Sequence, residues 1–194
     1  MTIDAILFDK DGTLFDFEAT WEAWARAFLL RVTEGDQGRA AKIGHEIGFD
    51  FPQNMIRPES IVVAGTPDEI VAAMLPHLPG MTGPALMYML NDEAASAPQT
   101  EAVPLVPFLD LLRRRGLKLG VATNDAESPA LAHLRSVDIV GHFDFIAGFD
   151  SGHGAKPSPG QLHAFADAVD VSVDRIAMVG DSTHDLEAGR RAGM

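Results

Sequence analysis

Short apolar runs alternate with stretches of helical character along the second half of the chain. Four runs have the length and the flanking residues of buried strands, at residues 5–8, 117–122, 143–147 and 175–179. Stretches typical of helices lie between the later runs, at residues 107–115, 128–135 and 159–169. Strands that alternate with helices build a parallel sheet with helices packed on it. The pattern therefore predicts an α/β fold with a doubly wound parallel core.

The helix predicted at residues 107–115 has recognisable ends. Pro107 suits its first position, because the N–H that proline lacks has no partner there, and Gly116 suits the position just past its end. Phe108, Leu111 and Leu112 would then share one face.

Polar residues follow three of the predicted strands directly. They are Asp9, Thr123 and, after one intervening glycine, Asp181. Ligands of parallel α/β sheets bind beyond the carboxyl ends of the strands. We therefore expect these side chains to converge on one site.

The segment at residues 16–98 does not fit the alternation of strands and helices. It follows the first strand immediately and has helical character. Glycine and proline residues interrupt it, namely Gly35, Gly44, Pro58, Gly80 and Pro84. We interpret it as a helical cap domain inserted into a core domain of residues 1–15 and 99–194, with residues 96–100 as the hinge that returns to the core.

Four aromatic residues mark the first helix of the insertion. Phe17, Trp21, Trp24 and Phe28 follow one another at spacings of four, three and four, which places them on one helix face. A surface that stacks on substrate is one interpretation. Packing into a core is favoured, because a stripe at this spacing is usually buried.

The charge of the chain restricts its partners. The formal net charge is −13, and the short run at residues 113–115 is the one cluster of arginines, placed where cations favour a helix end. This charge repels nucleic acid and anionic membranes. If the substrate is an anion, a metal ion or local cations must overcome the same field.

Composition places the chain among ordinary globular proteins. Hydrophobic residues make up 46% of 194 residues, enough for a core domain and an inserted subdomain. A run of about eighteen apolar residues is absent, and the N-terminus lacks the features of a signal peptide, so we expect a cytoplasmic protein. The chain has no cysteine, so any metal must be held by oxygen or histidine ligands.

The strongest chemical signal is the hexapeptide at residues 9–14, Asp-Lys-Asp-Gly-Thr-Leu, directly after the first strand. Two carboxylates in this loop could belong to an ordinary solvated turn, since Asp and Gly are common turn residues. The motif is short, so the remainder of the chain must decide between the two interpretations.

Here the sequence resembles the haloacid dehalogenase superfamily, whose phosphatases carry Asp-x-Asp-Gly-Thr after the first strand. Further motifs of that family are a Thr or Ser at a strand end, a lysine, and a pair of acids after another strand. Their matches, in the family's order, are Thr123, Lys156, and Asp181 with Asp185. Each match alone is weak, but one site explains all of them together.

The resemblance implies a Rossmann-like core with an inserted helical cap, and it assigns roles in phosphoryl transfer. Asp9 would attack phosphorus and form an aspartyl-phosphate, which divides one difficult hydrolysis into two easier steps. Asp11, on the same side of an extended chain, would protonate the leaving oxygen and then deprotonate the attacking water. Lys156 would supply positive charge between the two anions.

The remaining predicted site residues bind phosphate or metal. Thr123, Asn124 and Gly12 offer hydroxyl and backbone N–H donors to phosphoryl oxygens. Mg²⁺ prefers hard oxygen ligands, which Asp9, the backbone carbonyl of Asp11 and Asp181 can provide. The resemblance adds Asp185 as a support of the metal, directly or through water.

Among capped members of the family, phosphoglycolate phosphatases are the most similar, so we expect a small phosphorylated metabolite as the substrate. A phosphosugar mutase of the same family and a noncatalytic binding module that kept the fold stay open as alternatives. A dehalogenase is disfavoured, because those relatives replace the residue that matches Asp11. We expect a monomer or a homodimer.

The end of the chain differs from the family pattern. Relatives continue from a similar Ala-Gly into a further strand and a short tail, whereas this sequence stops at Met194. We therefore expect a truncated sequence with an unpaired sheet edge, although every predicted catalytic position lies inside it.

Overall fold

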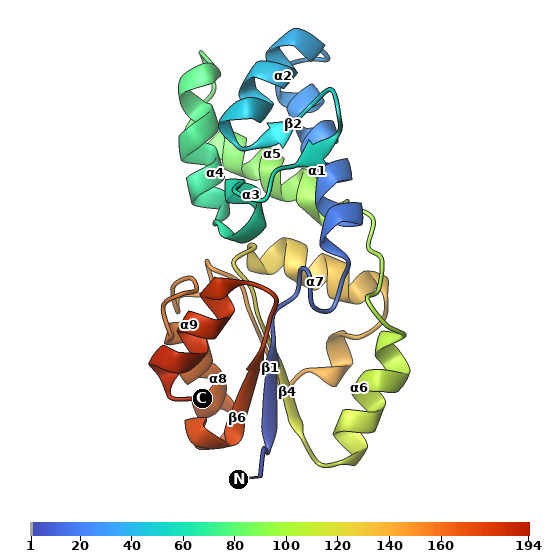
Figure 1. Cartoon of the computed structure of the whole chain (residues 1–194), viewed down its shortest axis with the longest axis vertical. Helices are drawn as coiled ribbons and strands as arrows, with labels where there is room; N and C mark the ends of the chain where they lie inside the picture. The colour runs from blue at the N-terminus through green and yellow to red at the C-terminus, as the bar shows by residue number, and fades with distance from the viewer. Residues whose placement is uncertain (1) are drawn as a thin grey trace. The chain divides into compact units, whose positions relative to one another are not determined.

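A computed structural model describes residues 2–194, and the chain divides into two compact units. One unit comprises the chain up to Asp16 together with Thr100–Met194, and the other comprises Phe17–Gln99 (Figure 1). Within residues 2–194, none of the helices combines the length and the apolar character needed to span a membrane.

The first unit is built on a four-stranded parallel sheet in the order β5-β4-β1-β6. The strands are β1 (Ala5–Phe8), β4 (Lys118–Ala122), β5 (Phe145–Ala147) and β6 (Ile176–Val179). β1 lies between β4 and β6, with Ala5 opposite Lys118 on one side and Ile176 on the other. The four predicted strands and the α/β fold class are confirmed.

Helices cover both faces of this sheet, as Figure 1 shows for α6 on one side and for α8 and α9 on the other. The helices are α6 (Leu105–Arg114), α7 (Glu127–Ser136), α8 (Gly160–Val169) and α9 (Thr183–Ala192), with short 3₁₀ turns η2 (Val140–His142) and η3 (Val173–Arg175). Side chains of a strand alternate between faces. Phe8 accordingly packs with residues of α6 and α7, whereas Leu7 packs with residues of α8 and α9.

The helix predicted at residues 107–115 begins earlier than its proline suggested. α6 starts at Leu105, with Pro104 as its N-cap, so Pro107 is its third residue and not its first. Proline is tolerated there because the N–H groups of the first turn have no partner inside the helix. Gly116, with φ +82°, follows the helix end as predicted.

Of the three residues that the sequence places on one face of α6, only Leu112 is buried. Leu105, Leu109 and Leu112 are buried, whereas Phe108 and Leu111 are 36% and 42% exposed. The buried residues follow a spacing of four and three that begins at Leu105, two residues before the predicted start of the helix.

The second unit is helical, with a short antiparallel hairpin that the sequence analysis missed. Its elements are α1 (Phe17–Val32), α2 (Gln37–Glu46), β2 (Phe49–Asp50), β3 (Met55–Ile56), α3 (Ile61–Ala64), α4 (Pro67–Met74), η1 (Leu75–His77) and α5 (Gly83–Ala95). Two of the expected interruptions lie inside helices, namely Gly44 in α2 and Pro84 in the first turn of α5. A Cβ on Gly44 would lie 3.1 Å from a methyl group of Leu29, so this glycine permits close packing.

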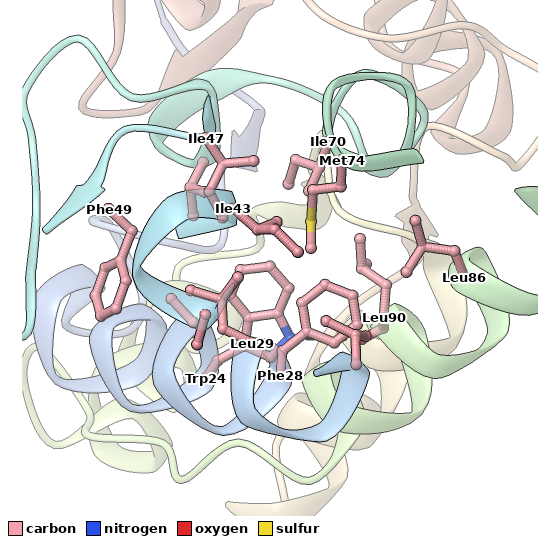
Figure 2. Close-up of a cluster of buried hydrophobic side chains, with 14 of the residues drawn as sticks. Trp24, Phe28, Leu29, Ile43, Ile47, Phe49, Ile70, Met74, Leu86 and Leu90 are labelled. Atoms are coloured by element: carbon pink, nitrogen blue, oxygen red, sulfur yellow. Dashed lines mark hydrogen bonds between the residues drawn. The ribbon is translucent and has the colours of Figure 1, made fainter. Parts of the chain in front are cut away.

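This unit has a hydrophobic core of its own, to which the aromatic stripe of α1 belongs (Figure 2). Trp24 and Phe28 are buried and stack with ring centroids 5.3 Å apart, and Trp21 meets Trp24 edge to face at 5.2 Å. Residues of α2, α4 and α5 surround them, including Ile43, Met74 and Leu90. The packing interpretation of the stripe is confirmed.

Candidate active site

Asp9 occupies the position directly after β1, in the centre of the sheet. Its backbone N–H donates to the carbonyl of Val179 at 2.8 Å, which continues the pairing with β6 by one residue. Its carboxylate is buried, and Oδ1 accepts a hydrogen bond from Lys156 Nζ at 2.8 Å. The predicted nucleophile and the predicted lysine are therefore in direct contact, although 147 positions separate them.

Lys156 is held at both ends. Its ammonium is buried and also contacts Asp185 Oδ1 at 2.6 Å, so it bridges two carboxylates. Its backbone is fixed by Asn124, whose Nδ2 donates to the Lys156 carbonyl at 2.9 Å and whose Oδ1 accepts from the Lys156 N–H at 2.8 Å. The side chain of Asn124 thus positions the lysine, while its predicted role in phosphate binding concerned the backbone.

Asp185 serves the fold as well as the site. Its Oδ2 accepts hydrogen bonds from the N–H of Ser182 at 3.0 Å and from its hydroxyl at 2.6 Å, which completes a capping box at the start of α9. A Cβ on Gly180 would lie 2.2 Å from Cγ of Asp185, so only glycine leaves room for this carboxylate. The cap fixes the carboxylate that holds Lys156.

Three carboxylates gather where β1 and β6 end. Asp9, Asp181 and Asp185 each offer an oxygen, and these oxygens lie within 4.8 Å of one another. Asp9 and Asp185 are buried, and Asp181 is exposed. Asp181 lies over Gly12, whose φ is +73° and whose added Cβ would fall 2.0 Å from Asp181 Oδ2. The sequence predicted these acids to converge, and the structure brings them together.

This group of donors fits a divalent cation that prefers oxygen. Asp9 and Asp185 contact the ammonium of Lys156, and Asp181 adds a third carboxylate, so the cluster carries an excess of negative charge that a bound cation would offset. The oxygens are hard ligands of the kind that Mg²⁺ selects. Oδ1 of Asp11 accepts a hydrogen bond from Lys10 at 2.7 Å, and the predicted contribution of Asp11 to the metal is through its backbone carbonyl.

The protonation of these groups follows from burial and from charge. The pKa of Asp9 is raised to about 6, because burial, together with the charges of Asp185 and Asp11, outweighs the opposing charge and hydrogen bond of Lys156. Burial also raises the pKa of Asp185, but Lys156 and the Ser182 hydrogen bonds outweigh it, so the net shift is downward. The pKa of Lys156 is raised, because its two carboxylates outweigh the cost of burial. Lys156 is therefore a cation, and a second cation would favour the ionised form of Asp9.

Thr123 ends β4 with a buried side chain. Its Oγ1 accepts a hydrogen bond from the N–H of Asp125 at 3.1 Å. Gln161 of α8 fixes the same strand end, because its Nε2 donates to the carbonyls of Thr123 at 3.0 Å and Gly148 at 2.9 Å. Gln161 is fully buried, and the sequence analysis missed it, since a single glutamine in a helix carries no distinctive signal.

The loop after β1 is a tight turn. The N–H of Gly12 donates to the carbonyl of Phe15 at 2.8 Å, and that of Leu14 donates to the carbonyl of Lys10 at 2.9 Å. The Gly12 N–H is thus directed into the turn, and its predicted contact with phosphate stays a prediction. Asp11 lies in this turn with its carboxylate largely buried.

Comparison with known proteins bears on this site directly. A model of the haloacid dehalogenase-like hydrolase family matches residues 3–193. The chain belongs to this family. The predicted family and the hydrolase class are therefore confirmed.

Relatives within the haloacid dehalogenase family carry names of phosphatases. The chain is 38% identical to a phosphoglycolate phosphatase of Neisseria meningitidis over 193 residues, which cover 98% of this chain and 77% of the relative. It is 28% identical to a phosphoglycolate phosphatase of Nitrosospira multiformis over 195 residues, covering 100% of this chain and 81% of the relative. The crystal structure of a predicted phosphoglycolate phosphatase of Haemophilus somnus superposes with a TM-score of 0.74 at 17% identity, covering 100% of this chain and 83% of that one. This last likeness shows the fold.

The motifs of the haloacid dehalogenase family did not predict one buried cation beside the site. Lys10, between the two acids of the first motif, is fully buried and contacts Asp11, Asp125 and His133. A lysine in a loop is usually solvated, and a single histidine in a helix is usually structural. No local pattern could have paired residues that lie 123 positions apart.

Proposed function

We propose that this protein is a Mg²⁺-dependent phosphatase that hydrolyses a small phosphate monoester through an aspartyl-phosphate on Asp9. One observation carries the proposal. A buried carboxylate directly after the central strand is paired with a buried ammonium and adjoins two further carboxylates. An anion held in this way beside a cation suits attack on a phosphate that is itself negative.

The first half of the reaction transfers the phosphoryl group. A carboxylate oxygen of Asp9 forms a bond to phosphorus while the bond between phosphorus and the ester oxygen breaks. Asp11, two positions along, gives a proton to that leaving oxygen, so the product departs as a neutral alcohol. The phosphoryl group remains on Asp9 as an acyl phosphate.

The second half returns Asp9 to its starting state. Asp11, now a carboxylate, accepts a proton from water, and the water oxygen attacks the phosphorus of the acyl phosphate. The bond between phosphorus and Asp9 breaks, which releases inorganic phosphate. Asp9 is again a carboxylate and Asp11 is again protonated, so the cycle closes.

Charge neutralisation is shared between the chain and the metal. Asp9, Asp181 and Asp185, with the backbone carbonyl of Asp11, would hold Mg²⁺, which when bound supplies positive charge to the phosphoryl oxygens. Lys156 contributes a second cation at 2.8 Å from Asp9. Thr123 and the backbone N–H of Asn124 are proposed as donors to the phosphoryl group, whereas the N–H of Gly12 is donated to the carbonyl of Phe15.

The substrate class follows from the relatives and from the inserted unit. The relatives named phosphoglycolate phosphatase make phosphoglycolate the first compound to test. We propose that the helical unit at Phe17–Gln99 acts as a cap that selects the substrate by its non-phosphate end and excludes water.

A screen of small phosphate esters tests the proposal, with phosphate release measured in the presence of Mg²⁺ and in the presence of a chelator. We expect Mg²⁺-dependent release by the wild type and a loss of about 10³-fold or more in kcat for Asp9→Asn. A glucose phosphate belongs in the panel, because conversion to an isomer without phosphate release would indicate a mutase. Failure to act on every ester with Mg²⁺ would contradict the proposal and favour a noncatalytic binding module.

A further inference from the structure

Lys10 holds one of the most enclosed charges in the molecule. Its side chain is 0% exposed, and its ammonium lies 2.7 Å from Asp11 Oδ1, 2.9 Å from His133 Nδ1 and 3.3 Å from Asp125 Oδ2. Removing an ammonium from water is unfavourable unless several partners replace the lost hydration. Here oxygen acceptors of Asp11 and Asp125 and a ring nitrogen of His133 do so.

These partners come from three separate parts of the first unit. Lys10 and Asp11 lie in the loop after β1, Asp125 lies in the loop after β4, and His133 lies in α7. Asp125 donates its own N–H to the hydroxyl of Thr123, and its Oδ1 accepts from the N–H of Ala126 at 2.8 Å. Lys10 therefore connects the loop that carries Asp9 and Asp11 to the loop that carries Thr123.

The hydrogen bonds of Lys10 have a defined direction. An ammonium has donors and no acceptor, so His133 Nδ1 must accept, which leaves the ring neutral with its proton on Nε2. The contact with Asp11 is made through Oδ1. This short contact at one oxygen restricts the rotation of the carboxylate.

We propose that Lys10 is a positioning residue for Asp11. It holds the carboxylate of Asp11 so that Oδ2 can deliver a proton to the leaving oxygen, with His133 and Asp125 fixing Lys10 in turn. The inference rests on the proposed function, because it assumes that Asp11 is the acid. A methionine of similar length would fill the same space, so filling space does not by itself require a buried ammonium here.

The dependence of the rate on the leaving group separates this role from a purely structural one. An alkyl phosphate needs a proton on its leaving oxygen, whereas p-nitrophenyl phosphate releases a stable anion and needs little help. The parameter to measure is kcat/KM, since it covers the steps up to release of the alcohol or phenol. Damage to the nucleophile or to the general fold would lower kcat/KM for both substrates alike.

The experiment compares wild type, Asp11→Asn, Lys10→Met and the surface control Lys118→Met on both substrates. Asp11→Asn should lose about 10²-fold or more on the alkyl phosphate and far less on p-nitrophenyl phosphate. Lys10→Met should show the same asymmetry, with a loss of about 10- to 100-fold on the alkyl phosphate and less than about 3-fold on the other. Lys118, an exposed residue of β4, should leave both values unchanged.

Each outcome decides the question. If Asp11→Asn shows the asymmetry and Lys10→Met loses both activities equally or neither, the positioning role is wrong while the proposed function stands. If the wild type hydrolyses no ester of the screen with Mg²⁺, the proposed function fails and the inference fails with it. Thermal unfolding shows whether Lys10→Met folds. If it does not, His133→Leu takes its place, because it removes one contact of Lys10. It must show the same asymmetry, with a smaller loss of kcat/KM on the alkyl phosphate. A symmetric effect of His133→Leu would overturn the proposal.

Discussion

Single side chains at the strand ends connect the chemistry to the fold. Asp185 caps α9 with one carboxylate oxygen and forms an ion pair with Lys156 through the other. The side chain of Asn124 forms two hydrogen bonds with the backbone of the same lysine. The links to Lys156 join residues that are 29 and 32 positions apart in sequence. A substitution at these positions therefore changes the geometry of the site even where the side chain does not touch substrate.

Gly12 gives a prediction that separates backbone strain from disturbance of the site. Gly12→Ala places a Cβ 2.0 Å from Asp181 Oδ2 and must displace that carboxylate. We expect the Mg²⁺ concentration needed for half-maximal phosphatase activity to rise at least about tenfold. The matched control is Gly116→Ala, which also has positive φ (+82°) but has no atom within 4 Å of the new Cβ. It should lower stability by about 1 kcal/mol and leave the Mg²⁺ dependence unchanged; equal Mg²⁺ dependence in the two variants would contradict this account.

At this scale the sequence predicted the acids and Lys156 because they stand in short motifs at strand ends. Lys10 escaped prediction, since its burial depends on His133, 123 positions away, and on a loop after another strand. Residue type argued for a solvated lysine, and tertiary structure overrode it. Gln161 was not predicted either, because its contacts are with Thr123 and Gly148, which are distant in sequence.

At the scale of elements, the parallel sheet is stabilised by partly exposed ion pairs as well as by its core. Asp144, just before β5, forms an ion pair with Arg113 of α6, lies 3.6 Å from Lys118 of β4 and accepts the N–H of Leu119 at 3.0 Å. One carboxylate thus ties a helix to two neighbouring strands. The strands themselves were predictable from apolar runs, whereas the first residue of α6 was not, because Pro104 and Pro107 both suit a helix start.

Asp144 gives a prediction with a defined pH dependence. Partial burial raises its pKa, but the Leu119 hydrogen bond and the charges of Arg113 and Lys118 outweigh this, so the net shift is downward. A carboxyl whose folded pKa is lowered stabilises the fold above its ordinary pKa near 4, and the stabilisation is lost as the pH falls through the folded value. Asp144→Asn should therefore lower the free energy of unfolding by about 0.5–1.5 kcal/mol at pH 7. Urea unfolding at several pH values checks this, and a difference from wild type that does not shrink in acid would contradict it.

At the scale of the whole molecule, two units with separate cores share one chain. The core of the second unit is formed around Trp24 and Phe28, and that of the first is divided between the two faces of the sheet. The two tryptophans and the single tyrosine of the chain all lie in the second unit, at positions 21, 24 and 88. Tryptophan fluorescence therefore reports on that unit alone.

This distribution predicts that core substitutions affect the two units unequally. Phe28→Ala should destabilise the second unit by about 3–5 kcal/mol, because it leaves a cavity in a fully buried cluster. The shift in the urea midpoint should be larger by tryptophan fluorescence than by hydrogen exchange of β1 and β4 amides. The matched variant Phe165→Ala, fully buried in α8, should reverse that order. Equal shifts by both probes in both variants would show that the units unfold as one.

The most direct test of the proposed chemistry is to trap the phosphorylated enzyme. Wild type and Asp11→Asn are mixed with a substrate found in the ester screen and Mg²⁺, quenched in acid and digested, and the peptides are analysed by mass spectrometry. We expect the mass of one added phosphoryl group on Asp9. With p-nitrophenyl phosphate as the substrate, more of it should be present in Asp11→Asn, because this leaving group needs little acid in the first half while the base for the second half is missing. Steady hydrolysis with no phosphoryl group on Asp9, or with the group on another residue, would contradict it.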